Sequence, residues 1–125
     1  MVEKAAYKIL LIEDSEAIGA RILKIISTIP SVELLGQART AKEGLELCSA
    51  LIPDLIFLDI NLPDTSGLEL LKKLKTGHPQ IQIIMLTNSS HEFYRNKCAE
   101  LGAKFFLDKT RDFPRILELI VQIMT

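Results

Sequence analysis

Short apolar runs alternate five times with longer amphipathic stretches along the chain. After Lys8, residues 9–12 are unbroken aliphatic side chains, and residues 55–58 are equally apolar, which is typical of strands buried on both faces. Residues 32–38 form a more mixed stretch of strand length, and further largely apolar runs occupy residues 81–86 and 105–107. The pattern therefore predicts five strands, each followed by a stretch with a different period.

The stretches after these runs place their apolar residues at helical spacing. The five predicted helices begin at Ser15, Thr40, Ser66, about Ser89 and Asp112. Three of these first residues are Ser or Thr followed three positions later by Glu, which is the spacing of a capping box. Pro30 ends the first helix, Gly102 takes the C′ position of the fourth, and Pro114 fits the first turn of the last.

Five strand–helix units with such short connections require parallel strands joined by right-handed crossovers. Helices must then cover both faces of one sheet. We predict a single α/β domain over residues 1–125, with its core at about residues 8–124: a doubly wound, three-layer sandwich built from five βα units around a parallel five-stranded sheet.

The composition places this domain among globular proteins and narrows its partners. Of its 125 residues, 48% are hydrophobic and 25% charged, and 15 basic residues against 16 acidic ones argue against a broad nucleic-acid footprint. Cys48 and Cys98 lie alone in apolar helical patterns, as buried free thiols do. The first residues lack the apolar run of a signal peptide, and no stretch has the length of a membrane span. We expect a cytoplasmic protein.

Candidate site residues follow four of the five predicted strands, whereas the second is followed by Arg39 and Thr40, which add no carboxylate. The first strand ends in Glu13 and Asp14, the third in Asp59, the fourth in Thr87, and Lys109 follows the fifth. Ligands of an open parallel sheet gather outside the carboxyl ends of its strands, where the strand order reverses. These side chains therefore converge at one edge if the first strand lies beside the third.

Each side-chain type has a chemical role at such an edge. Three carboxylates repel one another unless a cation lies among them, and hard oxygen ligands favour Mg²⁺. A carboxylate beside the metal can attack phosphorus, while Thr87 and Lys109 can hold phosphoryl oxygens. Taken singly, a strand-end Asp or Thr commonly caps the next helix. The combination favours a functional site.

Four segments together resemble a bacterial two-component receiver domain, a CheY-like fold, across about residues 8–124. They are residues 9–14 (ILLIED), 53–67 (PDLIFLDINLPDTSG), 86–87 (LT) and 101–109 (LGAKFFLDK). Each segment is a modest signal alone, and their order makes the resemblance strong. It implies the flavodoxin-like strand order 2-1-3-4-5 and a phosphorylation switch rather than an enzyme that acts on other molecules.

The resemblance also implies a role for each matching residue. Asp59 matches the phosphoacceptor, which receives its phosphoryl group from a histidine kinase phosphohistidine or a small phosphodonor. Glu13 and Asp14 match the acidic pair that holds Mg²⁺ together with Asp59. Asn61 matches the position whose backbone carbonyl also binds the metal.

Three further positions match residues that respond to the phosphoryl group. Thr87 and Lys109 match the hydroxyl and the ammonium that hold phosphoryl oxygens, and Phe106 matches the aromatic whose rotamer follows Thr87. Plain core packing is the alternative for Phe106, because phenylalanine has no hydroxyl that needs solvent.

The sequence departs from the family pattern at several positions. Glu13 stands where Asp is common, and its longer arm still reaches a metal, through water. Asn88 replaces a small residue, so access to the phosphoryl group is narrowed. Thr110 follows Lys109 where the family usually has Pro, which predicts a trans peptide and a different loop path. Asn61 and Ser89 occupy positions that tune hydrolysis in the family, with an effect that stays open here.

Other functions fit less well. An aspartyl-phosphate phosphatase of the haloacid-dehalogenase type needs a general acid two residues after its nucleophile, where this chain has Asn61. A flavodoxin-like or dinucleotide-binding module needs a glycine-rich phosphate loop, whereas residues 13–16 are acidic. His78 and His91 lack partners at metal spacing. A degenerate receiver that binds proteins without phosphorylation remains an alternative.

The expected output is a change in protein binding. The resemblance implies a sensor histidine kinase or phosphotransfer protein as donor and an effector protein downstream, with no direct contact to nucleic acid or membrane. The last helix is unusually apolar, with Ile116, Leu117, Leu119, Ile120, Val121, Ile123 and Met124. We expect the predicted fourth helix, fifth strand and last helix to form a partner or homodimer surface, the alternative being that these residues are buried. Whether the chain stands alone or belongs to a longer regulator stays open.

Overall fold

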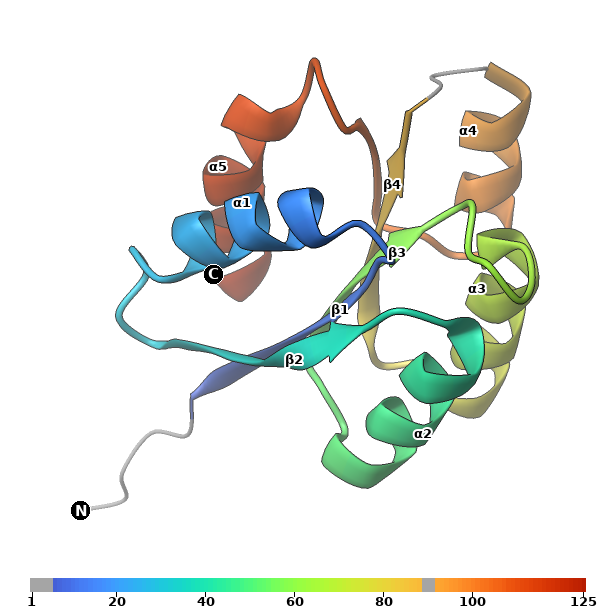
Figure 1. Cartoon of the computed structure of the whole chain (residues 1–125), viewed down its shortest axis with the longest axis horizontal. Coiled ribbons are helices and arrows are strands. Elements are labelled where there is room, and N and C mark those ends of the chain that lie inside the picture. Colours follow the sequence, from blue (N-terminus) through green and yellow to red (C-terminus); the bar gives the residue numbers. More distant parts are fainter. Residues whose placement is uncertain (1–5, 89–91) are drawn as a thin grey trace.

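Five parallel strands form one sheet in the order β2-β1-β3-β4-β5 in the computed structural model, which describes residues 6–88 and 92–125 (Figure 1). The strands are β1 (Tyr7–Ile12), β2 (Val32–Ala38), β3 (Leu55–Asp59), β4 (Gln82–Thr87) and β5 (Phe105–Asp108). All four neighbouring pairs are parallel. The predicted doubly wound α/β fold and strand order are confirmed.

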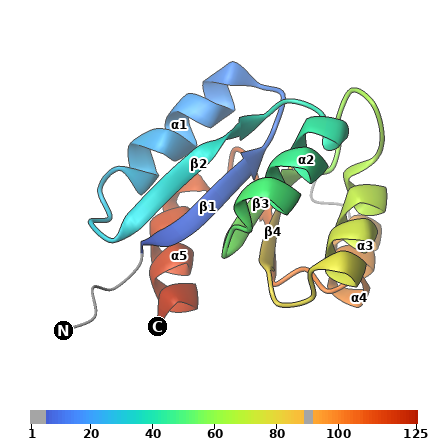
Figure 2. The same ribbon diagram turned by 90° about the horizontal axis from the view of Figure 1, so that it is seen from below.

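Helices cover both faces of this sheet. They are α1 (Glu16–Ile26), α2 (Ala41–Leu51), α3 (Gly67–Gly77), α4 (Glu92–Glu100), the short 3₁₀ helix η1 (Phe113–Arg115) and α5 (Ile116–Met124). Figure 2 shows α1 and α5 on one side of the sheet and α2, α3 and α4 on the other. None of the helices in the described ranges has the length and apolarity that a membrane crossing requires.

The two layers explain why the strands have no polar face. Ile9 and Leu11 of β1 pack with the α1–α5 layer, whereas Leu10 and Ile12 pack with the α2–α3–α4 layer. All five residues of β3 are buried. Successive side chains of a strand point to opposite faces. A strand between two helical layers must therefore be apolar on both faces, so its sequence is an unbroken apolar run.

Helix ends largely follow the capping residues in the sequence. Thr40 Oγ1 accepts a hydrogen bond from the Glu43 N–H, although the Glu43 carboxylate accepts from Arg39 rather than from Thr40 itself. Gly102 follows α4 with φ +100°, and the Ala103 N–H donates to the Cys98 carbonyl. These bonds confirm Gly102 as the C′ residue, because a side chain is strained at positive φ.

Two helix boundaries differ from the prediction. The first helix ends at Ile26 instead of reaching Pro30, although Ile29 is still buried beyond it. The last begins with the 3₁₀ turn of η1, because Asp112 makes no side-chain capping bond there and its carboxylate accepts instead from the Asp108 N–H. The predicted start of the fourth helix at Ser89 lies outside the described residues.

A bulge in β2 changes which residues face each layer. Ile9 pairs with Leu34, but its neighbour Leu10 pairs with Gly36, so β2 has one residue more than β1 at this point. Gly36 adopts φ +154°, a conformation that residues with side chains rarely take. As a result Gln37 pairs with Leu11 and lies on the α1 side of the sheet.

Candidate metal centre

The carboxyl ends of β1, β3, β4 and β5 bring the predicted site residues together. Glu13 and Asp14 directly follow β1, and Asp59 and Thr87 are the last residues of β3 and β4. Lys109 follows β5, and its N–H donates to the Thr87 carbonyl at 2.7 Å. This edge lies where the strand order reverses, between β1 and β3, which is the expected position of a ligand site.

Three carboxylates meet at this edge. One oxygen each of Glu13, Asp14 and Asp59 lies within 4.8 Å of the others. Glu13 is fully buried and Asp59 is 3% exposed, whereas Asp14 is exposed at the rim. The cluster is therefore closed toward the sheet and open to solvent on the Asp14 side.

The Lys109 ammonium is inserted among these carboxylates. Its Nζ lies 2.6 Å from Glu13 Oε1 and 3.1 Å from Asp59 Oδ2, and the side chain is almost fully buried. Burial alone would lower the pKa of Lys109, but the close contact with the Glu13 carboxylate and the charges of Asp59 and Glu13 raise it above its ordinary value. The lysine is therefore held in its charged form.

Glu13 has an environment that differs from that of an ordinary glutamate. Burial raises the pKa of Glu13 to about 6, and the Asp59 charge adds to this rise, whereas the Lys109 ammonium and the Ser15 N–H act against it. Its Oε2 accepts from the Ser15 N–H at 3.0 Å. Its Oε1 is fully buried and, despite the close ammonium, receives no hydrogen bond of good angle from the described residues.

These donors fit a hard divalent cation. Three carboxylates and one ammonium leave a local charge of −2, and the buried Glu13 Oε1 has unused capacity as an acceptor. Oxygen donors on one side and open solvent on the other suit Mg²⁺, which keeps several waters in its shell. Glu13, Asp14 and Asp59 could hold such an ion.

The loop after β3 folds tightly over Asp59. The Asn61 N–H donates to Asp59 Oδ1 at 3.1 Å, and Asn61 forms a bridge with Ser66. A Cβ on Gly67 would lie 2.1 Å from the Asp59 carbonyl oxygen, so only glycine fits at this position. The sequence does not predict this close approach, because Gly67 appears there only as the last residue of the segment 53–67.

The remaining predicted positions lie around this cluster. Thr87 is 2% exposed at the end of β4, and Asn88 is exposed beside it. Ser89 lies outside the described residues. Phe106 is buried in the core beside α4, and the Arg95 guanidinium lies 5.0 Å from its ring centroid. Core packing of Phe106 is thus present, and its proposed switching role stays a prediction.

Thr110 takes part in a compact turn that holds Lys109. The Lys109–Thr110 peptide is trans, as predicted. Asp108 Oδ1 accepts from the Thr110 N–H and hydroxyl and from the Arg111 N–H, and these bonds lower the pKa of Asp108 to about 2. The Asp108 N–H in turn donates to Asp112 Oδ2. The sequence analysis gives Asp112 only as the first residue of the last helix and assigns no role to Asp108, although an Asp side chain commonly accepts from the N–H two residues on.

Two other residues near the site were also missed. The side-chain amide of Gln37 donates to the carbonyls of Glu13 and Ser15. Asp64 accepts from the first two N–H groups of α2, which lowers its pKa below the ordinary value. A sequence motif does not reveal either contact, since each joins segments more than twenty residues apart.

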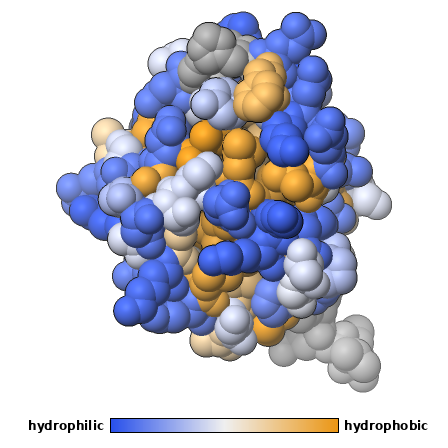
Figure 3. All heavy atoms as spheres, turned by 90° about the vertical axis from the view of Figure 1, so that its right-hand side faces the viewer, coloured by the Kyte–Doolittle hydropathy of each residue, from blue (hydrophilic) through white to orange (hydrophobic). Residues whose placement is uncertain are grey.

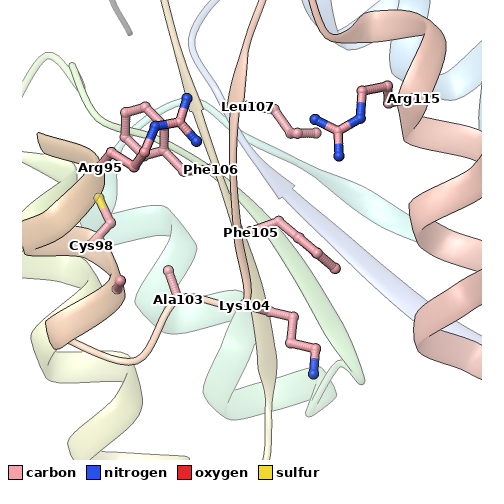
Figure 4. Close-up of a pocket in the computed structure, with 9 residues that line it drawn as sticks. Arg95, Cys98, Ala103, Lys104, Phe105, Phe106, Leu107 and Arg115 are labelled. Atoms are coloured by element: carbon pink, nitrogen blue, oxygen red, sulfur yellow. The ribbon is translucent and has the colours of Figure 1, made fainter. Parts of the chain in front are cut away.

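A shallow groove lies beside the outer edge of β5. It has a volume of about 230 Å³ and its lining includes Arg95, Lys104 and Arg115 (Figure 4). In this view Phe106 points toward Arg95 on α4, while Phe105 points to the other side of the strand. Figure 3 shows apolar side chains exposed between hydrophilic ones on the side of the molecule that carries α3 and α4.

The apolar last helix is buried on one side only. Ile116, Leu119 and Ile120 are buried against the sheet, whereas Leu117 and Val121 are 43% and 45% exposed. The alternative of burial therefore holds for one side of α5, and the partner or homodimer surface stays a prediction. Leu117 lines a groove between α1 and α5 instead of the groove beside β5.

Comparison with known proteins identifies related sequences over most of the chain. Residues 9–121 match the family model of the response regulator receiver domain. The chain is 33% identical over 114 residues to the nitrate/nitrite response regulator protein NarL of Escherichia coli K12, covering 91% of this chain and 53% of NarL. It is 34% identical over 104 residues to a protein-glutamate methylesterase/protein-glutamine glutaminase of Geobacillus kaustophilus, covering 82% of this chain and 30% of that protein.

A solved structure gives the same correspondence. The chain matches a CheY-like response regulator receiver domain protein of Methanospirillum hungatei with a TM-score of 0.85 and 29% identity, over 94% of this chain and 93% of that one. The chain spans about half the length of NarL and a smaller part of the methylesterase.

Proposed function

The chain belongs to the response regulator receiver domain family, and we propose that it accepts a phosphoryl group on Asp59 in a reaction that requires Mg²⁺. Receiver domains are the signalling switches of two-component systems. The observation that carries the proposal is the buried contact of Lys109 with Glu13 and Asp59 inside a cluster of three carboxylates.

Each residue of the cluster has a distinct part in this reaction. Glu13, Asp14, Asp59 and the Asn61 carbonyl would hold Mg²⁺, which offsets the negative charge that gathers during phosphoryl transfer. An Asp59 carboxylate oxygen attacks the phosphorus of the phosphohistidine, so an O–P bond forms as the N–P bond breaks.

Two further groups would stabilise the phosphoryl oxygens. The Lys109 ammonium, now shared between Glu13 and Asp59, is within reach of a phosphoryl group on Asp59. Thr87, buried at the end of the next strand, would donate its hydroxyl to a second oxygen. Asn88, exposed beside Thr87, would limit access of water to the acyl phosphate.

The switch would act through protein partners. We propose a sensor histidine kinase or phosphotransfer protein as donor, and a downstream effector or a second copy of the chain as partner of the α4-β5-α5 surface. Phe106 supports this route, since it pairs with Met85 of β4 and its ring lies next to the Arg95 guanidinium of α4. We also propose that residues 1–125 form a single receiver domain. A cytoplasmic location stays a prediction.

Intact-mass measurement after incubation with acetyl phosphate tests the function. Wild-type protein with Mg²⁺ should gain one phosphoryl group, and the Asp59→Asn variant and an EDTA-treated sample should gain none. Glu33→Gln, which removes an exposed carboxylate of β2, is the matched control and should react like wild type. Absence of any gain in folded wild-type protein would instead support a degenerate receiver that binds partners without phosphorylation.

A further inference from the structure

The side-chain amide of Gln37 in β2 binds the backbone on both sides of Asp14, the exposed carboxylate of the site. Gln37 Nε2 donates to the Glu13 carbonyl at 2.6 Å and to the Ser15 carbonyl at 3.1 Å. Asp14 is the residue between these two carbonyls. Both acceptors are oxygens, so the NH₂ end of the amide must face the loop. A single group thus fixes the backbone on both sides of Asp14.

The amide also fits closely against α1. A Cβ on Gly19 would lie 2.0 Å from Gln37 Oε1 and 2.6 Å from its Cδ, and the three nearest neighbours of this position all belong to Gln37. The Gly19 N–H donates to the same Ser15 carbonyl that accepts from Gln37. Glycine at position 19 therefore leaves the space that the amide occupies.

The bulge in β2 makes this contact possible. Leu34 lies on the α1 side before the bulge, and Gln37 lies on the same side after it, although three positions separate them. A regular strand would turn residues 34 and 37 to opposite faces. The extra residue at Leu35 and Gly36 therefore places the amide under the β1–α1 loop.

We propose that Gln37 is a positioning residue for the metal site: it holds the Glu13–Asp14–Ser15 backbone in the form that binds Mg²⁺. This inference rests on the proposed function. Glu13 is fixed by contacts of its own carboxylate, whereas the exposed Asp14 depends on its backbone for position. Repulsion among the three carboxylates favours movement of the loop at residues 13–15 away from Asp59. The two hydrogen bonds from the Gln37 amide oppose that movement.

The first test measures Mg²⁺ binding by calorimetry and by the rise in melting temperature that Mg²⁺ causes. Gln37→Leu keeps the side-chain size and removes both donors, so its dissociation constant for Mg²⁺ should rise about tenfold, as for other residues that orient metal ligands. Gln82→Leu is the matched control, since Gln82 is a half-buried glutamine at the opposite end of a strand. It should bind Mg²⁺ like wild type.

A second variant displaces the amide without removing it. Gly19→Ala should also weaken Mg²⁺ binding about tenfold, because the new Cβ takes the place of Gln37 Oε1. In a Gln37→Ala background the same substitution meets no amide, so it should have no further effect. Gly77→Ala, with no atom within 4 Å of its Cβ position, is the control.

Phosphoryl uptake as a function of Mg²⁺ separates positioning from general damage. In Gln37→Leu the Mg²⁺ concentration for half-maximal uptake should rise about tenfold, while uptake at saturating Mg²⁺ should equal that of wild type. Unchanged Mg²⁺ affinity in folded Gln37→Leu or Gly19→Ala would overturn the inference and leave the proposed function standing. Wild-type protein that neither binds Mg²⁺ nor takes up phosphate would overturn both.

Discussion

Replacement of Asp59 by Asn should stabilise the metal-free protein rather than weaken it. The substitution removes one negative charge from the cluster and keeps the side-chain shape, including an Oδ1 that can still accept from the Asn61 N–H. Lys109 keeps its 2.6 Å contact with Glu13. The local charge falls from −2 to −1 because the amide is neutral.

The magnitude follows from the distances in the cluster. At an effective dielectric constant of about 20, Asp59 and Glu13 oxygens no more than 4.8 Å apart repel by at least about 3.5 kcal/mol, and the exposed Asp14, screened by water, adds about 1 kcal/mol. The 3.1 Å contact between Asp59 and Lys109 is attractive by about 5 kcal/mol, so the attraction and the repulsion that act on Asp59 nearly cancel. Burial of the charged carboxylate still costs several kcal/mol, more than burial of an amide. We expect a gain of about 1–3 kcal/mol.

Urea unfolding followed by circular dichroism in EDTA measures this difference. Saturating Mg²⁺ should shift the difference in favour of wild type, since an ion at a hundredfold excess over its dissociation constant stabilises wild type by about 2.7 kcal/mol and the Asp59→Asn variant less. Glu33→Gln should stay within about 0.5 kcal/mol of wild type in both buffers. A variant less stable than wild type in EDTA would refute the reasoning, because it would mean that the Lys109 contact outweighs repulsion and burial.

Two further substitutions test the backbone around the site. Gly67→Ala should lower the free energy of unfolding by about 3 kcal/mol, since its Cβ would meet the Asp59 carbonyl oxygen, whereas Gly77→Ala should not destabilise; urea unfolding of the two variants compares them directly. Asp108→Asn should destabilise at pH 7, because the charged carboxylate is the better acceptor for its three donors. The pKa of Asp108 is lowered from 3.8 to about 2, so its contribution is complete above pH 3.8 and is lost as the pH falls through 2. The stability gap between the variant and wild type should therefore narrow from pH 4 to pH 2, and a constant gap would contradict the assignment.

The sequence predicts this fold well because a sheet covered by helices on both faces requires a recognisable pattern of apolar and capping residues. Strands buried on both faces are unbroken apolar runs, as at residues 55–58, and capping residues such as Thr40 mark the helices between them. The site residues are predictable for the same reason. Once the strands are assigned, the polar residues at their carboxyl ends share one edge, and Glu13, Asp59 and Lys109 follow from position alone.

What the sequence hides are contacts between segments that only the folded chain brings together. Gln37 reads as a polar residue near the end of a strand, and its role depends on a register shift that pairing with β1 creates. Asp108 reads as a loop aspartate and Asp112 as the first residue of the last helix, yet both are buried and hold the turn around Lys109. Local patterns report burial and period, whereas the partner of a polar side chain depends on distant chain segments.

The extra residue in β2 also determines where insertions and deletions are compatible with this fold. Strand residues alternate between two layers, so loss of one residue at positions 35–36 would exchange the layers of everything after it, sending Gln37 toward α2 and Ala38 toward α1. The turn at residues 27–31 precedes the strand, and a change of its length leaves this alternation intact. Insertions and deletions in related chains should therefore gather before Val32 and be rare between Leu34 and Ala38.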